Sequence, residues 1–226
     1  MKDAHIVRAY DDELRRLQNL LFEMGGRCEA QLADAIRALE TRDPELAATV
    51  VRQDMLVDAL EMEIEGLVLR LFALRQPLAV DLRQVLSSLK MAAWLERVGD
   101  YAKNVAKRTI ELLREPPAPP TRSVLELGRR VQAQLNTCLD AVAKMDLERA
   151  ETVWRGDREL DELYLAASQE TTTCMRANPD SVPSCTQLAF IAKNLERIGD
   201  LATNIVEVLH FSVTGRRLTE PRPRGD

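Results

Sequence analysis

The chain has 226 residues, enough for one large domain or for two domains of about 110 residues each. Its hydrophobic content of 46% supplies a buried core, and scarce aromatic residues beside abundant Leu, Ala, Glu and Arg favour helices. The net charge of −5 excludes the overall basic field of a nucleic-acid-binding protein, so we expect no direct nucleic-acid binding.

The cysteines and the N-terminus indicate a reducing compartment. Cys28, Cys138, Cys174 and Cys185 show no CxxC or other metal-type spacing, which indicates free thiols. The N-terminus lacks the apolar core of a signal peptide, and no uncharged apolar stretch approaches the roughly 20 residues that cross a bilayer. We therefore expect a cytoplasmic protein.

The first half of the chain predicts three long helices. The first runs over about residues 4–39. Asp43 supplies an N-cap and Pro44 a first-turn proline for the second, which continues to about residue 73. Gln76-Pro77 ends this helix, and the third covers about residues 80–114.

Four prolines within residues 116–120 then form a stiff connector that no helix can cross. A fourth helix is expected over about residues 123–144, and a fifth, capped by Asp146, continues to about residue 176. The sixth covers about residues 184–213 and stops at Gly215.

Long helices joined by short turns form antiparallel bundles. The expected fold is therefore all-α, with six long helices that form two tandem antiparallel three-helix bundles related by internal duplication. The predicted first repeat covers residues 1–115, a Pro-rich linker residues 116–122, the second repeat residues 123–215, and a disordered tail residues 216–226.

The evidence for duplication is a motif that occurs twice. LERVGDYAKNV at residues 95–105 and LERIGDLATNI at residues 195–205 align without gaps, 100 positions apart. DMLVD at residues 54–58 likewise has a counterpart in DRELD at residues 157–161. Each segment has the form acid-x-x-x-acid, which places both acids on one helix face. The interval from Asp54 to Glu96 is 42 residues and from Asp157 to Glu196 is 39, a difference that a loop absorbs.

We expect each antiparallel helix pair to bring four carboxylates together at the edge of its apolar face. Such groups need protons, basic partners or a cation, because unpaired buried charge costs several kcal/mol or more. Oxygen ligands without His or Cys suit hard divalent or trivalent cations, with iron, Mn, Mg and Zn left open. The predicted ligands are Asp54, Asp58, Glu96 and Asp100 in the first half, Asp157, Asp161, Glu196 and Asp200 in the second, and Asn104 and Asn204 as auxiliary ligands.

Two features of the motifs leave other interpretations open. Arg97 and Arg197 adjoin the acids, and these or other basic residues would make the clusters plain salt bridges. Gly99 and Gly199, at equivalent helical positions, indicate either close helix packing or space for a group beside the aspartates.

The two LER[VI]GDxAxN[VI] segments and their Asp-x-x-x-Asp partners resemble the PhoU/PhoY family of bacterial phosphate-transport regulators. RQPLAVDLRQVLSSLKM at residues 75–91 is similar to that family's segment between its second and third helices, and the resemblance covers about residues 5–215. It implies two three-helix bundles whose acidic motifs bind multinuclear iron or other cations. One departure, NPDSVPSCTQLAF at residues 178–190, indicates that the halves need not bind metal equally.

The same resemblance implies a non-enzymatic, cytoplasmic negative regulator. Its implied partners are the ATPase subunit of the high-affinity phosphate ABC transporter and the phosphate-sensing histidine kinase, which is held in its signalling-off state when phosphate is plentiful. We also expect a homodimer that meets the membrane only through these partners.

Two alternatives come from other classes of protein. A dinuclear metal oxidase in a ferritin-like bundle needs two Glu-x-x-His motifs, but only Glu207–His210 occurs, and its first-half counterpart ends in Ile110. A helical adaptor of another signalling role remains the second alternative. The sequence has no Gly-rich loop, GKS/GKT or plausible Ser/His/Asp arrangement, so nothing indicates nucleophilic catalysis or phosphate capture.

Overall fold

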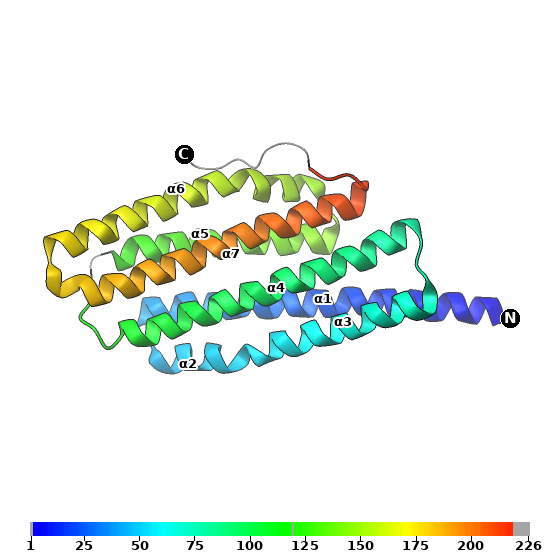
Figure 1. Cartoon of the computed structure of the whole chain (residues 1–226), viewed down its shortest axis with the longest axis horizontal. Coiled ribbons are helices and arrows are strands. Elements are labelled where there is room, and N and C mark those ends of the chain that lie inside the picture. The colour runs from blue at the N-terminus through cyan, green and yellow to red at the C-terminus, as the bar shows by residue number, and fades with distance from the viewer. Residues whose placement is uncertain (1, 119, 219–226) are drawn as a thin grey trace.

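The computed structural model describes residues 2–118 and 120–218, with the backbone alone for residues 2–8. Within these ranges the regular structure is entirely helical, and no strand occurs, as predicted (Figure 1). The elements are α1 (Lys2–Thr41), α2 (Pro44–Gln53), α3 (Met55–Arg75), α4 (Ala79–Leu112), α5 (Thr121–Lys144), α6 (Leu147–Ala177), the short 3₁₀ turn η1 (Pro179–Ser181) and α7 (Val182–Thr214).

The second predicted helix is divided in two at Asp54. The backbone there keeps helical angles, φ −54° and ψ −37°, but it tightens, because the Val57 amide bonds to the Asp54 carbonyl at 2.8 Å. An i to i+3 bond of this kind is typical of a 3₁₀ turn. α2 and α3 follow one another along one position of the bundle (Figure 1), so the predicted six-helix arrangement is confirmed.

The duplication is also visible in the helix starts. Asp43 caps α2 and Asp146 caps α6, 103 positions later. In each case Oδ1 accepts bonds from the backbone amides two and three residues further on, at 2.9 Å in the first half and at 3.0 and 3.1 Å in the second. The residues before these caps, Arg42 and Met145, both have left-handed backbones, with φ 55° and 52°. Both halves therefore turn from one helix to the next in the same way.

The two bundles share one apolar core rather than meeting as separate bodies. α4 lies along α7, and α1 packs against α5 (Figure 1). A Cβ placed on Gly128 of α5 would lie 3.3 Å from Ile36 of α1 and 3.5 Å from Leu195 of α7. Gly25 of α1 makes the matching close approach to Leu139 of α5. The buried apolar side chains of both repeats thus form one continuous cluster.

Two connecting segments are held against the helices. The carbonyl of Pro116 accepts a 2.6 Å bond from Ser184, and Ala118 is buried, so the proline segment is docked at the start of α7. After α7, Gly215 adopts the left-handed angle φ 72° that ends helices. Of the predicted disordered tail, residues 219–226 lie outside the described residues. None of the helices in the described ranges combines the length and apolarity that crossing a membrane requires.

Candidate functional site

The acidic residues of the first half lie together where α3 faces α4. Their burial differs: Asp54 is only 4% exposed, Glu96 and Asp100 are half-buried, and Asp58 is exposed at the edge, further out than predicted. Oδ1 of Asp54 accepts a 3.0 Å bond from Nε2 of Gln31, on α1. We call Asp54, Asp58, Glu96 and Asp100 the first acid cluster.

Lys103, which sequence reasoning did not select, bridges this cluster. Its Nζ bonds to Oδ2 of Asp54 and to Oδ1 of Asp100, so one ammonium joins the α2–α3 break to α4. Burial alone would lower the pKa of Lys103, but the hydrogen bonds to Asp100 and Asp54 outweigh it and raise the pKa above its ordinary value. Lys103 is therefore a permanent cation at this position.

The remaining carboxylates of the first half repel one another. Burial, followed by the charges of Asp100, Glu61 and Asp58, raises the pKa of Glu96 to about 7. Partial burial and the nearby Asp54 likewise raise the pKa of Asp58. The acids of α3 and α4 are therefore near enough to raise one another's pKa. Glu61, one turn beyond Asp58 on α3, is an additional member that the paired motif did not reveal.

The acidic residues of the second half form an equivalent group, the second acid cluster: Asp157, Asp161, Glu196 and Asp200. Asp157 is 3% exposed and accepts a 3.1 Å bond from the hydroxyl of Thr203. Burial raises the pKa of Glu196; Asp200 and Asp161 add to this rise, and a 2.8 Å bond from Lys193 opposes it. The acids of α6 and α7 therefore also face each other.

The two clusters are neutralised differently. Lys103 of the first motif aligns with Thr203 of the second, and Lys193 of the second half aligns with Ala93 of the first. The first cluster thus has its lysine between the buried aspartate and Asp100. The second has its lysine beside Glu196, with a side chain 43% exposed.

A buried glutamine accompanies each buried aspartate. Gln31 and Gln134 are 103 positions apart, the spacing that also relates Asp54 to Asp157. Gln31 donates to Asp54 through Nε2, whereas Nε2 of Gln134 has no hydrogen-bond partner within the described residues; the Oε1 atoms of both glutamines are buried there without a partner. Gln134 is 2% exposed, and its Oε1 lies 3.4 Å from the Cβ position of Gly156, the residue before Asp157.

The repeated glycines allow close helix packing. A Cβ on Gly99 would lie 3.3 Å from Cγ1 of Val57 and 3.4 Å from Oδ1 of Asp54. A Cβ on Gly199 would lie 2.6 Å from Cδ1 of Leu160, closer than carbon atoms approach. Of the two interpretations of these glycines, the structure therefore supports close packing.

The donor chemistry of the clusters fits a hard cation, because every candidate ligand is an oxygen. Their geometry does not form a ready metal centre: among the side chains that the structure describes, no three His, Cys, Asp or Glu residues converge in a way that holds an ion. In the first cluster the ammonium of Lys103 occupies the place between Asp54 and Asp100. The salt-bridge interpretation named Arg97 and Arg197 as candidate partners of the acids. In the structure the Arg97 guanidinium lies over the ring of Trp94, and that of Arg197 lies over the ring of Tyr101.

The auxiliary residues and the Glu-x-x-His motif lie around surface cavities. Asn104 lines one of about 320 Å³ and Asn204 another of about 660 Å³ beside Trp94. Glu207 lines the cavity of Asn204, but His210 lines a different one, so the two do not share a site.

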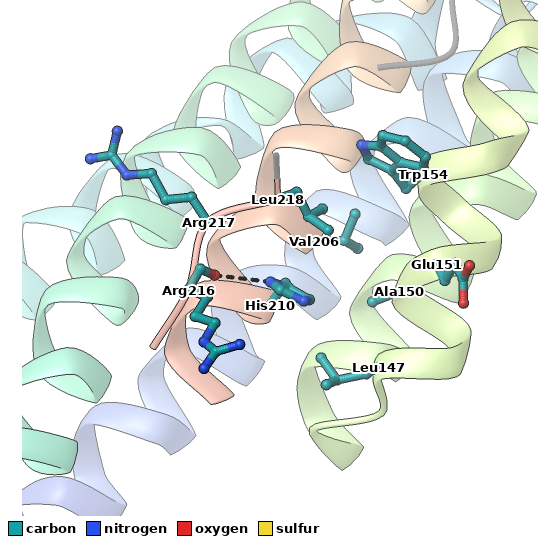
Figure 2. A pocket seen from close by; sticks show the side chains of 9 residues that line it. All are labelled: Leu147, Ala150, Glu151, Trp154, Val206, His210, Arg216, Arg217 and Leu218. Carbon is teal, nitrogen blue, oxygen red and sulfur yellow. Dashed lines mark hydrogen bonds between the residues drawn. The ribbon is translucent and has the colours of Figure 1, made fainter. Parts of the chain in front are cut away.

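The cavity of His210 measures about 450 Å³ and lies between α6, α7 and the C-terminal segment. Figure 2 shows Trp154 and His210 facing it, with Nδ1 of His210 3.0 Å from the Arg216 carbonyl, while the Arg217 guanidinium points away. The described residues of its lining combine apolar side chains with Glu151, His210 and two arginines.

Comparison with known proteins gives the family. A sequence profile of the PhoU domain matches residues 21–109 and again residues 124–209. The chain belongs to the PhoU family. The two matches contain one acid cluster each, so the internal repeat inferred from the motifs is a repeat of the PhoU domain.

PhoU relatives match over nearly the whole chain. The phosphate-specific transport system accessory protein PhoU homolog of Caulobacter vibrioides is 48% identical over 98% of this chain and 97% of its own length. The accessory protein PhoU of Escherichia coli is 35% identical over 95% of this chain and 89% of its own. The crystal structure of PhoU from Pseudomonas aeruginosa superposes with a TM-score of 0.89 at 36% identity, covering 92% of this chain and 100% of that one.

Proposed function

We propose that this PhoU protein is a non-catalytic negative regulator of the phosphate-starvation response. It couples the ATPase subunit of the high-affinity phosphate ABC transporter to the phosphate-sensing histidine kinase, and it keeps the kinase in its signalling-off state when phosphate is plentiful. The supporting observation is the near full-length similarity to proteins named as accessory proteins of the phosphate-specific transport system. In this proposal the protein is a cytoplasmic homodimer that reaches the membrane only through its partners.

The architecture suits a protein that acts by docking. Its helices of up to 40 residues present long faces, a common basis of helix-mediated recognition. Hydrogen bonds join the acidic groups to lysines, a threonine and a glutamine. These features favour an adaptor over an enzyme.

Gene deletion tests the regulatory role. A strain without this gene should express a phosphate-starvation reporter in phosphate-rich medium, and the wild-type gene on a plasmid should silence it. An unchanged reporter would refute the regulatory role.

Co-purification tests the coupling. The protein should capture both the transporter ATPase and the kinase in high phosphate, and the capture should change in low phosphate. If it couples the transporter to the kinase, repression of the reporter should fail in cells that lack the ATPase. Full repression in such cells would argue for another signalling route.

We further propose that the acid clusters bind a hard cation, iron, Mn, Mg or Zn, which stitches each helix pair together. Elemental analysis of protein purified without a histidine tag or chelator tests this. Replacing Glu96, Asp100, Glu196 and Asp200 together by alanine should remove the metal. Unchanged metal content would show that these are not the ligands, and metal without any reporter phenotype would favour an adaptor of another signalling role.

A further inference from the structure

The outer side of α3 carries a continuous apolar stripe. Exposed residues that are apolar or glycine recur along it at alternating intervals of four and three: Met55, Ala59, Met62, Gly66, Leu69 and Ala73. The side chains of Met55, Met62 and Leu69 are 68%, 65% and 68% exposed. We call these six residues the α3 stripe. Their spacing is that of the seam along which two helices pack in a coiled coil.

We propose that the α3 stripe is a docking surface for an amphipathic helix of a partner protein, a helix whose own apolar seam is flanked by lysines and arginines. The inference names the kind of segment that the adaptor proposed above would recognise, and in that respect it rests on the proposed function.

The second repeat shows that the fold does not require this stripe. α6 takes the place of α3 there and runs along the opposite edge of the molecule (Figure 1). The residues 103 positions after the stripe, the spacing that relates Asp54 to Asp157, are also exposed but mostly polar: Arg158, Glu162, Leu165, Gln169, Thr172 and Arg176. α3 already contributes to the core from its inner side, through residues such as Ile64 and Leu71. Its apolar outer side is therefore available for a contact outside the chain.

The stripe has the length and the open space that a docked helix needs. From Met55 to Ala73 it extends about 27 Å, at about 1.5 Å per residue. A Cβ placed on Gly66 would meet no atom within 4 Å among the described residues. The small residues alternate with Met55, Met62 and Leu69, so the apolar side chains of a second helix fit between the large ones.

One side of the stripe is lined by acids. Asp58, Glu61 and Glu65 lie along it at helical spacing, and all are at least partly exposed. Burial, followed by the charges of Glu65 and Asp58, raises the pKa of Glu61, so the three acids act on one another. On the other side, Glu63 is paired with Arg16 of α1 at 2.7 Å. Lysines and arginines beside the seam of a docked helix would neutralise the first side.

A second copy of the chain would neutralise these acids less well. By the heptad geometry of paired helices, Glu65 would face Glu65 in an antiparallel pair of α3 helices. In a parallel pair Asp58 would face Glu63, and Glu65 alone would gain a basic partner, Arg70. An anionic lipid surface would be repelled by the same acids. The charge around the stripe therefore favours a basic helix of another protein.

Two designed peptides test the surface on the full chain. Both have the 21-residue length of α3 and a leucine seam, with lysines beside the seam in one and glutamates in the other. In fluorescence anisotropy the lysine peptide should bind at least roughly tenfold more tightly than the glutamate peptide. Met62→Glu should weaken binding of the lysine peptide at least roughly tenfold, because docking would bury a carboxylate, and Met62→Leu should bind as wild type does. Leu165→Glu, at the equivalent exposed position of α6, is the matched control and should leave binding unchanged.

A charge exchange tests the acidic side. Glu65→Lys should weaken binding of the lysine peptide and strengthen binding of the glutamate peptide, each at least roughly threefold. Glu126→Lys, at an exposed position of α5, changes the net charge equally and should alter neither affinity by more than about twofold. Equal effects of the two variants would show that net charge alone attracts the peptide, and would overturn the proposal.

Photo-cross-linking in cells tests the natural partner. Benzoylphenylalanine at position 62 should cross-link to a partner protein, and the same residue at position 165 should not. Mass spectrometry of the cross-linked peptide should give a segment with apolar residues at intervals of three and four and more Lys and Arg than Asp and Glu. Cross-linking to a second copy of this chain, to lipid or to an acidic segment would overturn the proposal, and so would the absence of a cross-link at position 62.

The phosphate-starvation reporter separates this inference from the regulatory role. Suppose that deletion of the gene switches the reporter on, but folded Met62→Glu protein represses it as wild type does and binds the lysine peptide unchanged. The docking surface is then refuted and the regulatory role stands. If deletion leaves the reporter unchanged while the peptides and cross-links behave as expected, the regulatory role is refuted and the docking surface stands.

Discussion

Replacing Lys103 by Met should destabilise the metal-free protein by about 2–3 kcal/mol. Removing one member of a buried ion pair costs about 3–5 kcal/mol, because the other charge stays buried without compensation. The cost is smaller here, because the Lys103 side chain is 20% exposed and Asp54 keeps its bond from Gln31. Met retains most of the aliphatic volume, so the change tests the charge rather than the packing.

A double-mutant cycle with Asp54→Asn isolates the pair. Urea unfolding followed by circular dichroism, with chelator present, should give a coupling free energy of about 2 kcal/mol between the two changes. Lys107→Met, at the exposed position one turn away, should change the free energy of unfolding by less than about 0.5 kcal/mol. A coupling below about 0.5 kcal/mol would refute the reasoning, since it would show that the pair behaves like a solvated surface salt bridge.

Three further predictions concern other parts of the chain. Asp43→Ala and Asp146→Ala should each lower the free energy of unfolding, measured with urea, by about 1 kcal/mol. The Asn variants, which also cap helices, should lower it little; equal losses for Ala and Asn would exclude capping as the cause. In the folded, metal-free protein the pKa of Glu96 is raised to about 7, so this side chain is protonated at pH 5. In the unfolded chain the same side chain ionises above its ordinary pKa of 4.5. The free energy that ionising Glu96 costs the folded state therefore grows between pH 4.5 and about pH 7 and is complete above that. Glu96→Gln should accordingly stabilise the protein more at pH 8 than at pH 5, and an equal effect at both pH values would contradict the shift. Burial raises the pKa of the Cys28 and Cys138 thiols, so both should resist Ellman's reagent until the protein unfolds; prompt reaction of either would contradict their burial.

The fold was predictable from local signals. Asp43 and Asp146, the prolines after residue 115 and Gly215 mark helix ends by chemistry that acts within a few residues. The break at Asp54 was not predictable in this way, since its backbone keeps helical angles and nothing in its neighbours interrupts a helix. It is found where a buried carboxylate bonds to other helices, which is a tertiary effect.

Of the candidate site, only the acidic residues were predictable from the sequence. The repeat predicts which carboxylates lie near one another, and the pKa values of Glu96 and Glu196, both raised by burial and by neighbouring acids, are consistent with that prediction. Their partners do not follow from the repeat, because the aligned positions Lys103 and Thr203 carry groups of different charge. Gln31 and Gln134 lie far from the motifs in sequence, and only their shared spacing from the aspartates marks them.

The core that runs through both PhoU repeats has a consequence for the covalent connection between them. Each repeat alone would leave the apolar sides of α1 and α4, or of α5 and α7, in water, since these helices cover one another across the molecule. The backbone around Pro116 therefore links two halves that their shared core already holds together, and it is not a pivot about which the halves rotate. A chain cleaved there should yield two fragments that find each other in solution and reassemble, and heating should melt the intact protein in a single step.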